Sequence, residues 1–261
     1  MRALLRHCAT GWIQGERAGE NRGLNMFHRN GPTLFELLRQ ALSSTDAGYD
    51  LLAPKFEFTP FRTPDLVLEA AAATITRPVS RILDLCCGTG AGMRAFRSVC
   101  TGQIVGVDRS AGMLAEARRS LAKGTGAPFA TVQGDALSLP FRPSFEVVTC
   151  FGAFGHILEP DEPRLVVQIA RALRPGGRFI FVTSDEPPRL HPGRLAAEAF
   201  NAAMRLRNVL IKPQFVMYYL TFLLPRARAL LEAQGFTVDA PENLLPPPFR
   251  GLRLVTATLG R

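Results

Sequence analysis

The feature that most constrains this sequence is a repeated alternation between short apolar runs and helix-like segments. Short apolar runs bounded by turn residues are typical of buried strands, and strands joined through helices indicate a parallel sheet covered on both faces. The predicted strands are residues 80–85, 104–107, 130–133, 146–151 and 179–183. The predicted helices are residues 33–42, 64–74, 93–99, 110–121 and 163–173, and residues 49–64 are expected to form an aromatic loop.

Two of the helix starts are marked by local signals. Ser110 is a natural N-cap for the helix that follows it. Pro64 fits the start of a helix, because its fixed backbone angle suits that position and the nearby Asp65 and Glu69 favour the N-terminal end of the helix dipole.

Four loops are expected to meet where ligands bind in such sheets, beyond the carboxyl ends of the strands. The first, CCGTGAG, contains Gly88 and Gly90, whose missing Cβ atoms allow a ligand to approach the backbone closely. It is not a dinucleotide fingerprint, because Met93 stands where the third glycine belongs, and it lacks the Gly-Lys-Ser/Thr of a phosphate loop.

Acidic residues follow the next two strands. Asp108 ends one strand and could accept hydrogen bonds from both hydroxyls of a ribose, and Asp135 follows the next and could accept from an exocyclic amine. Each of them alone could be a turn residue. Together with the glycine-rich loop they predict a site for a nucleoside-containing cofactor.

Five stretches resemble, in order and spacing, the class I S-adenosylmethionine-dependent methyltransferases of the small-molecule, ubiquinone/menaquinone-biosynthesis type. They are ILDLCCGTG, VGVDRSAGML, VQGDALSLPF, FEVVTCFGAFGHI and RALRPGGRFIFV, and the resemblance extends from about residue 49 to the C-terminus. It implies an α/β, Rossmann-like fold with a seven-stranded, mostly parallel sheet, helices on both faces and an antiparallel last strand. Residues 230–238 and 253–260 are placed to supply the closing strands.

The resemblance also implies S-adenosyl-L-methionine as the cofactor and gives roles to residues in the four loops. The methionine end would be held by Asp84 and the loop backbone, the ribose by Asp108, and the adenine by the residues that follow Asp108 and by the third loop. The implied cofactor residues are Asp84, Cys86, Cys87, Gly88, Gly90, Asp108, Arg109, Met113, Asp135, Ala136 and Phe151, the last near the sulfonium. Cys86 departs from the family pattern, because it replaces the first glycine of the loop.

Two further residues are predicted to act around this cofactor. The sulfonium is already activated, so alignment of donor and acceptor is the main requirement, and a base is needed only if the acceptor must lose a proton. His156 is the candidate catalytic base, with simple lining of the pocket as the alternative. Arg62, within the aromatic segment 49–63, is predicted to pair with the cofactor carboxylate; the alternative is that this segment only packs on the sheet.

The expected organisation has three parts. Residues 1–25 are expected to be a disordered tail, residues 26–75 a helical and aromatic lid, and residues 76–261 a methyltransferase core with a helical insertion at about 185–225. The insertion contains two apolar segments, 195–211 and 215–225, expected to form a helical pair. This pair could roof an acceptor pocket, form a dimer or membrane-surface contact, or be core packing.

Composition narrows the functional classes. The net charge of +9 is scattered without a basic run, and the Asn/Asp-Pro-Pro stretch of base-amine methyltransferases is missing after the fourth strand, so no nucleic-acid partner is expected. Five cysteines without a CxxC pair favour a reducing compartment, and no apolar run has the length of a membrane helix or a secretory signal. A cytoplasmic location is therefore expected.

The adjacent cysteines Cys86 and Cys87 are not predicted to bind metal or act as nucleophiles. Neighbouring side chains at a strand end point in different directions, and no activating neighbour is evident in the sequence. The predicted function is methyl transfer to a small, hydrophobic or aromatic molecule. The alternatives are an RNA or protein methyltransferase and a non-catalytic S-adenosylmethionine-binding protein.

Overall fold

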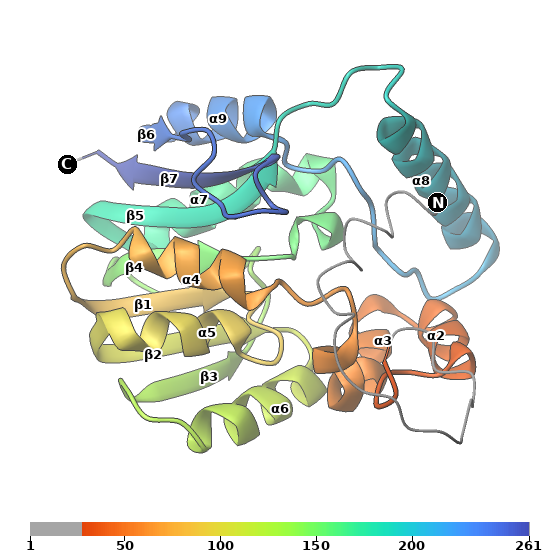
Figure 1. The fold of residues 1–261 in the computed structure, drawn as a ribbon, viewed down its shortest axis with the longest axis horizontal. Helices are drawn as coiled ribbons and strands as arrows, with labels where there is room; N and C mark the ends of the chain where they lie inside the picture. Colours follow the sequence, from red (N-terminus) through yellow and green to blue (C-terminus); the bar gives the residue numbers. More distant parts are fainter. Residues whose placement is uncertain (1–27, 261) are drawn as a thin grey trace.

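A single seven-stranded sheet organises residues 28–260, the part of the chain that the computed structural model describes (Figure 1). The strand order is β3-β2-β1-β4-β5-β7-β6, and β7 alone runs antiparallel to its neighbours. The strands are β1 (Val79–Leu85), β2 (Cys100–Asp108), β3 (Phe129–Gln133), β4 (Phe145–Cys150), β5 (Leu173–Ser184), β6 (Phe236–Asp239) and β7 (Leu252–Leu259). The predicted sheet is confirmed, whereas the predicted tail, residues 1–25, lies outside the described residues.

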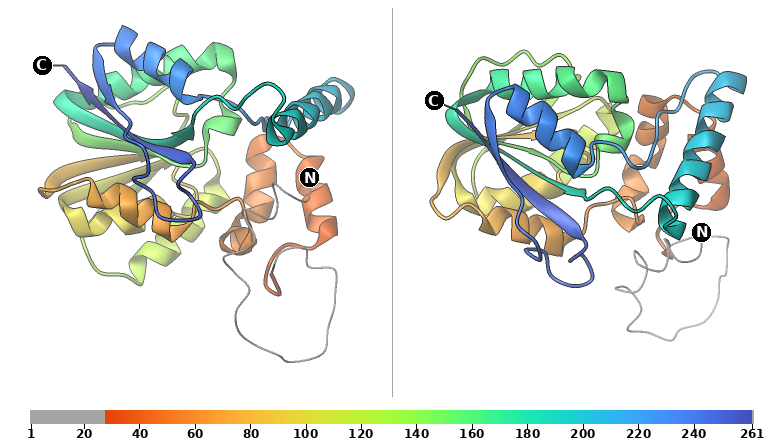
Figure 2. Two further views of the ribbon diagram at one scale, coloured as in Figure 1. Left: turned by 45° about the horizontal axis from the view of Figure 1, so that its top comes forward. Right: turned by 90° about the horizontal axis from the view of Figure 1, so that it is seen from above.

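Helices cover both faces of the sheet, as the apolar character of its strands requires (Figures 1 and 2). One face packs against α4 (Asp65–Ala73), α5 (Ala91–Phe96) and α6 (Ala111–Ala122), and the other against α7 (Glu162–Ala172) and α9 (Leu224–Ala233). Successive strand residues alternate between the two resulting cores: Ile82 and Val147 are buried on the first face, and Leu83 and Val148 on the second.

The sheet has its topological switch point at β1. Strand β1 pairs with β2 on one side and with β4 on the other, so the chain runs outward through β2 and β3 and then returns to the opposite side of β1. In the register, Leu85 lies level with Val107 and Cys150. The connections leaving these three strand ends therefore diverge around one crevice.

The two marked helix starts are confirmed, and one of them is fixed by a capping hydrogen bond. The Ser110 side chain accepts the Met113 N–H, and Pro64 is the N-cap residue of α4. At the N-terminal end, Thr33 and Glu36 form a capping box that starts α2 (Leu34–Ala41), inside the predicted helix at 33–42.

Two sequence predictions in the N- and C-terminal parts are wrong. The expected loop at 49–64 contains the second half of α3 (Thr45–Leu52) and the 3-10 helix η1 (Ala53–Phe58), because Ser44 caps α3 and Pro54 fits the first turn of η1. Residues 230–233 belong to α9 rather than to a strand. That helix ends before Gly235, whose φ of 82° starts the turn into β6.

The insertion is helical only in its first half. Helix α8 (Pro192–Leu210) matches the predicted helix at 195–211, but residues 215–223 are not helical, so the predicted helical pair is wrong. Asparagine side chains of α8 hold this second segment. Asn208 accepts from the Phe215 N–H and donates to the Phe215 carbonyl, and Asn201 does the same with Tyr219. These bonds take the place of the backbone bonds that a helix would make.

Candidate active site

A pocket lies over the carboxyl ends of β1, β2 and β4, between the sheet and the segment that contains α3 and η1. Its walls combine backbone of the glycine-rich loop, acidic side chains and aromatic rings. The lining residues are Thr45, Asp46, Tyr49, Phe56, Phe61, Arg62, Thr63, Leu68, Asp84, Cys86, Cys87, Gly88, Thr89, Ala91, Gly92, Val107, Asp108, Arg109, Ser110, Met113, Gly134, Ala136, Phe151, Gly152, Ala153 and His156.

The glycine-rich loop turns sharply out of β1. Cys86, Gly88 and Gly90 all have positive φ, at 52°, 52° and 81°. This region favours glycine, so Cys86 is a strained substitute for the glycine that the family pattern places there. A Cβ atom on Gly88 would meet nothing within 4 Å, which leaves open space for a ligand against the loop backbone.

Asp108 joins this loop to the end of β2. Its carboxylate accepts the Gly88 N–H at 2.8 Å and the Ser110 N–H at 2.9 Å. Burial raises the pKa of Asp108, and these two backbone bonds oppose the rise. Each carboxylate oxygen has a second lone pair, so the group retains the capacity to accept from two ligand hydroxyls.

Asp84 is the most deeply buried acid of the pocket, with 2 % of its surface exposed. The Thr149 hydroxyl donates to it at 2.6 Å, and a Cβ on Gly92 would come within 2.6 Å of its carboxylate. Burial raises the pKa of Asp84 to about 7, although hydrogen bonds from Thr149 and the Met93 N–H lower it. This group therefore gains or loses a proton near neutral pH, and a ligand cation beside it would favour the charged form.

Helix α3 is held over the pocket by its acidic side chains. Asp50 accepts the Ser110 hydroxyl at 2.6 Å and the Gly112 N–H at 2.8 Å, at the N-terminal end of α6. Asp46 accepts from Arg109 at 2.8 Å. Acceptors at a helix N-terminus are favourable, because its first N–H groups have no partner within the helix.

A hydrogen-bonded pair, Tyr49 and His156, forms the aromatic end of the pocket. The Tyr49 hydroxyl lies 2.6 Å from His156 Nε2, and His156 Nδ1 lies 2.6 Å from the Val216 carbonyl oxygen. A carbonyl only accepts, so Nδ1 carries a proton and Nε2 accepts from the tyrosine. Burial lowers the pKa of His156 and raises that of Tyr49, which keeps both groups neutral at physiological pH.

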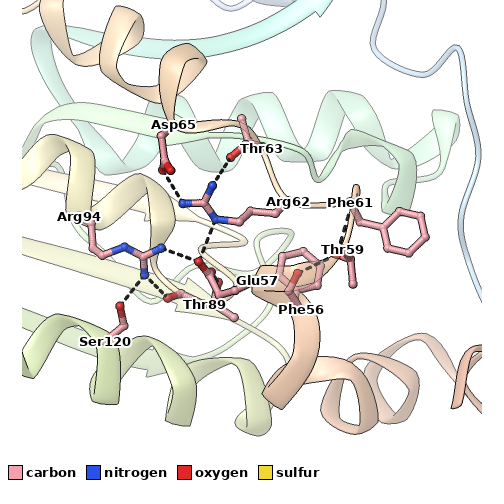
Figure 3. Close-up of polar contacts among 10 residues, drawn as sticks. All are labelled: Phe56, Glu57, Thr59, Phe61, Arg62, Thr63, Asp65, Thr89, Arg94 and Ser120. Atoms are coloured by element: carbon pink, nitrogen blue, oxygen red, sulfur yellow. Dashed lines mark hydrogen bonds and ion pairs between the residues drawn. The ribbon is translucent and has the colours of Figure 1, made fainter. Parts of the chain in front are cut away.

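Arg62 lies at the centre of a charged cluster that connects η1 to α5 (Figure 3). Its guanidinium contacts Asp65, and Glu57 bridges it to Arg94 and to the Thr89 hydroxyl. The buried Arg62 Nε lies 2.9 Å from a Glu57 oxygen but is poorly aligned with it, so this N–H makes no hydrogen bond within residues 28–260. Arg62 lines the pocket, and its guanidinium is already paired with the carboxylates of Glu57 and Asp65.

Most of the residues predicted from the sequence meet in this pocket. The lining includes Arg62, Asp84, Cys86, Cys87, Gly88, Asp108, Arg109, Met113, Ala136, Phe151 and His156. Gly90 is not part of the lining: its Cα faces α6, where a Cβ would press on Ala117 at 3.2 Å. Asp135 lies at the margin, 3.6 Å from Arg109, and one of its oxygens accepts the Leu137 N–H.

The two adjacent cysteines point in different directions, as predicted. Cys87 is buried, and a Cβ on Gly106 of β2 would lie 2.8 Å from its sulfur, so it fills space between the strands and α5. Burial raises the pKa of the Cys87 thiol well above its usual range, which opposes a role as nucleophile. Within residues 28–260 no group of three or more histidine, cysteine or acidic side chains is arranged to hold a metal ion.

The pocket fits an adenosine-containing cofactor with an amino-acid tail. An open backbone cradle at Gly88 and a carboxylate with free acceptor capacity at Asp108 suit a ribose, and the guanidinium of Arg62 lies in the same pocket wall. The sequence reasoning missed Glu57, Thr89 and the Tyr49–His156 pair. Glu57 is the one acid within the aromatic stretch 53–63, and this isolated charge is the signal that could have identified it.

Comparisons with known proteins identify the family of the chain. Residues 82–177 match the model of a family described as "Methyltransferase domain". A demethylmenaquinone methyltransferase of Thermus thermophilus is 34% identical over 186 residues, which cover 68% of this chain and 80% of that protein. One of Symbiobacterium thermophilum is 38% identical over 123 residues, or 46% of this chain, and the chain spans about half (48%) of that relative's length.

Solved structures agree on the fold. Magnesium protoporphyrin IX methyltransferase from Synechocystis, solved with bound S-adenosylhomocysteine, superposes with a TM-score of 0.55 at 15% identity, over 75% of this chain and 83% of that chain. The sheet, the pocket at its switch point and the similarity to the Thermus thermophilus protein together show the family. The chain belongs to the class I S-adenosylmethionine-dependent methyltransferases of the small-molecule type.

Proposed function

We propose that the chain transfers a methyl group from S-adenosyl-L-methionine to a small, aromatic acceptor of the quinol type. The observation that carries this proposal is the division of the pocket into a polar part at Gly88 and Asp108 and an aromatic part at Tyr49 and His156. The names of the relatives in Thermus and Symbiobacterium support a naphthoquinone-derived acceptor. The chain covers only part of those proteins, so their substrate is proposed here and not carried over.

The cofactor would lie along the polar part of the pocket. Asp108 would accept from the ribose hydroxyls, Arg109, Met113, Asp135 and Ala136 would surround the adenine, and Phe151 would lie near the sulfonium. Asp84 and the loop of Cys86, Cys87, Gly88 and Gly90 would surround the amino-acid end, with the Arg62 cation near its carboxylate. When bound, this cofactor supplies a methyl group on a positively charged sulfur, which needs no further activation by the protein.

The aromatic part of the pocket would supply a route by which a proton leaves the acceptor. An acceptor hydroxyl placed against Tyr49 could pass its proton to the phenol oxygen while the phenol proton moves to His156 Nε2. His156 can take this proton because its other nitrogen is held by the Val216 carbonyl, which fixes the tautomer. The predicted base role of His156 is thereby refined, because its free nitrogen faces Tyr49.

Methylation of RNA or protein and cofactor binding without turnover are the alternative functions. The pocket is narrowed by α3 and by rings from Phe56 and Phe61, which favours a small acceptor over a macromolecule. A cytoplasmic location, with no nucleic-acid partner, remains our prediction.

Transfer of labelled methyl groups tests the proposal directly. We expect label in a demethylmenaquinol with a short side chain, and none in RNA or protein fractions of a lysate, when the full chain is supplied with labelled S-adenosylmethionine. The Asp108→Ala variant serves as the control for background transfer. Label in RNA or protein with none in the quinol, or cofactor binding without any transfer, would reject the proposed function.

Measurements of cofactor affinity distinguish the role of Cys86 from that of Asp108. We expect Cys86→Gly to bind S-adenosylhomocysteine within about twofold of wild type, because glycine accepts the positive φ at this position. Asp108→Ala is expected to weaken binding by at least about tenfold, since it removes hydrogen bonds to a charged acceptor. Isothermal titration calorimetry measures both, and similar losses in the two variants would contradict the assignment.

The role of the Tyr49–His156 pair is tested by measuring turnover and cofactor affinity separately in the same variants. We expect Tyr49→Phe and His156→Ala each to lower kcat by about a hundredfold, the usual contribution of a general base, with little change in S-adenosylhomocysteine affinity. Tyr218→Phe is a matched control, because its hydroxyl contacts Asn208 and does not line the pocket. A kcat close to wild type in both pair variants would rule out the proton route.

Asp84 should make cofactor binding depend on pH. The cofactor ammonium favours the carboxylate, so affinity for S-adenosylhomocysteine is expected to rise by up to about tenfold per pH unit below the pKa of about 7, and to level off above it. Without ligand, the folded state holds a proton that the unfolded state releases near pH 4, so the same group lowers stability as pH rises toward 7. Asp84→Asn should flatten both profiles in calorimetry and thermal unfolding. Unchanged profiles would disprove the linkage.

A further inference from the structure

Helix α8 exposes its apolar residues. Leu206, Val209 and Leu210 are 60 %, 74 % and 72 % exposed, whereas the buried positions of the helix are Ala197, Asn201 and Asn208. A helix on the surface of a folded domain normally shows the opposite arrangement, with its apolar stripe facing the core. The outer side of α8 is therefore apolar surface that the described fold leaves in contact with water.

The inner side of α8 is occupied by polar contacts. Asn201 and Asn208 each donate to a backbone carbonyl and accept a backbone N–H from residues 215–219, at 2.8 to 3.0 Å. These four bonds fix which side of the helix faces the protein. Rotating α8 to bury its leucines would leave the buried amide groups and the segment backbone without hydrogen-bond partners, which is unfavourable.

Helix α2 repeats this inverted arrangement beside the end of α8. Phe35, Leu38 and Leu42 are 74 %, 53 % and 56 % exposed, and the buried residue of α2 is Gln40. Arg207 of α8 donates to the Ala41 carbonyl at 3.0 Å and to the Ser43 carbonyl at 3.1 Å, which joins the two helices. Both lie at the end of the molecule opposite the C-terminus (Figures 1 and 2). We call the exposed side chains of Phe35, Leu38, Leu42, Leu206, Val209 and Leu210 the α2–α8 face.

The charges around this face are positive. Residues 199–225 contain Arg205, Arg207 and Lys212 and no aspartate or glutamate. The acids beside these segments are paired with cations: Glu186 and Glu198 with Arg194, and Glu36 of α2 with Lys55. Arg39 adds a further exposed cation on α2, and within residues 28–260 neither Arg39 nor Lys212 forms an ion pair.

We propose that the α2–α8 face docks on the surface of an anionic lipid bilayer. Exposed apolar side chains on a helix with flanking cations suit the boundary between headgroups and acyl chains, where the apolar groups are buried and the cations meet lipid phosphates. No helix within residues 28–260 is long and apolar enough to cross the bilayer, which leaves docking in the plane of the surface. The docking does not depend on the proposed methyl transfer.

The position of the face connects it to the pocket. Helix α3, which packs beside α2, contributes Tyr49 to the pocket wall, and the segment held by Asn208 contributes the Val216 carbonyl that fixes His156. A bilayer on the α2–α8 face would thus lie next to the aromatic end of the pocket. An acceptor dissolved in the membrane could then enter without crossing water.

Sedimentation with lipid vesicles tests this docking. We expect the full chain to sediment with phosphatidylcholine vesicles that contain about one-third phosphatidylglycerol, and far less with phosphatidylcholine alone. Leu206→Gln with Val209→Gln should lower the partition coefficient by about tenfold or more. Arg39→Gln with Lys212→Gln should lower it by about fivefold for each cation, on anionic vesicles only.

Leu244→Gln is the matched control, because Leu244 is 48 % exposed but lies in the β6–β7 connection, away from both helices. It should bind as wild type does, and thermal unfolding should show that all variants are folded. The docking is overturned if wild type does not bind anionic vesicles or if all variants bind equally. A dimer in light scattering that dissociates in the Leu206 and Val209 variant, without vesicle binding, would assign the face to a second copy of the chain and also overturn it.

Discussion

The position of β1 between β2 and β4 is the constraint on which the rest of the molecule depends. These strands are parallel and in register, so Leu85, Val107 and Cys150 lie at the same level near the carboxyl edge of the sheet. The loops that follow β2 and β4 therefore lead away on opposite sides of β1. Backbone N–H groups and carboxylates from different parts of the chain thereby face one space. The Gly88 N–H bond to Asp108 spans the first two of these loops and holds the floor of the pocket.

The acidic side chains of the segment over the pocket attach it to the loops and helices beneath. Asp46 and Asp50 of α3 bind Arg109 and the start of α6, and Glu57 of η1 binds Thr89 and Arg94. These partners belong to the same loops that line the site. The acids that hold the segment over the pocket are therefore bonded to the same loops and helix starts that form the pocket.

The sheet and most of its helices could be predicted from local sequence signals. A continuous apolar strand and a capped helix start are both determined by residues that are close together in the sequence. Pocket residues at strand ends could be predicted for the same reason. The sequence could not reveal Tyr49 against His156, which are 107 residues apart, or the extended course of residues 215–223. The latter is fixed by side chains of α8, and the local apolar pattern of FVMYYLTFLL favours a helix that these contacts override.

The asparagine bonds between α8 and residues 215–219 have a consequence for how this enzyme can diversify. This segment does not line the pocket itself but lies behind His156. It is held by the side chains of Asn201, Asn208 and Thr45 and contributes no hydrogen bonds to the sheet ladder. Its side chains can therefore change without disturbing strand pairing, as long as both asparagines remain. A change in this segment reaches the pocket only through the Val216 carbonyl that orients His156, so the aromatic end of the pocket can be altered without a change in the sheet.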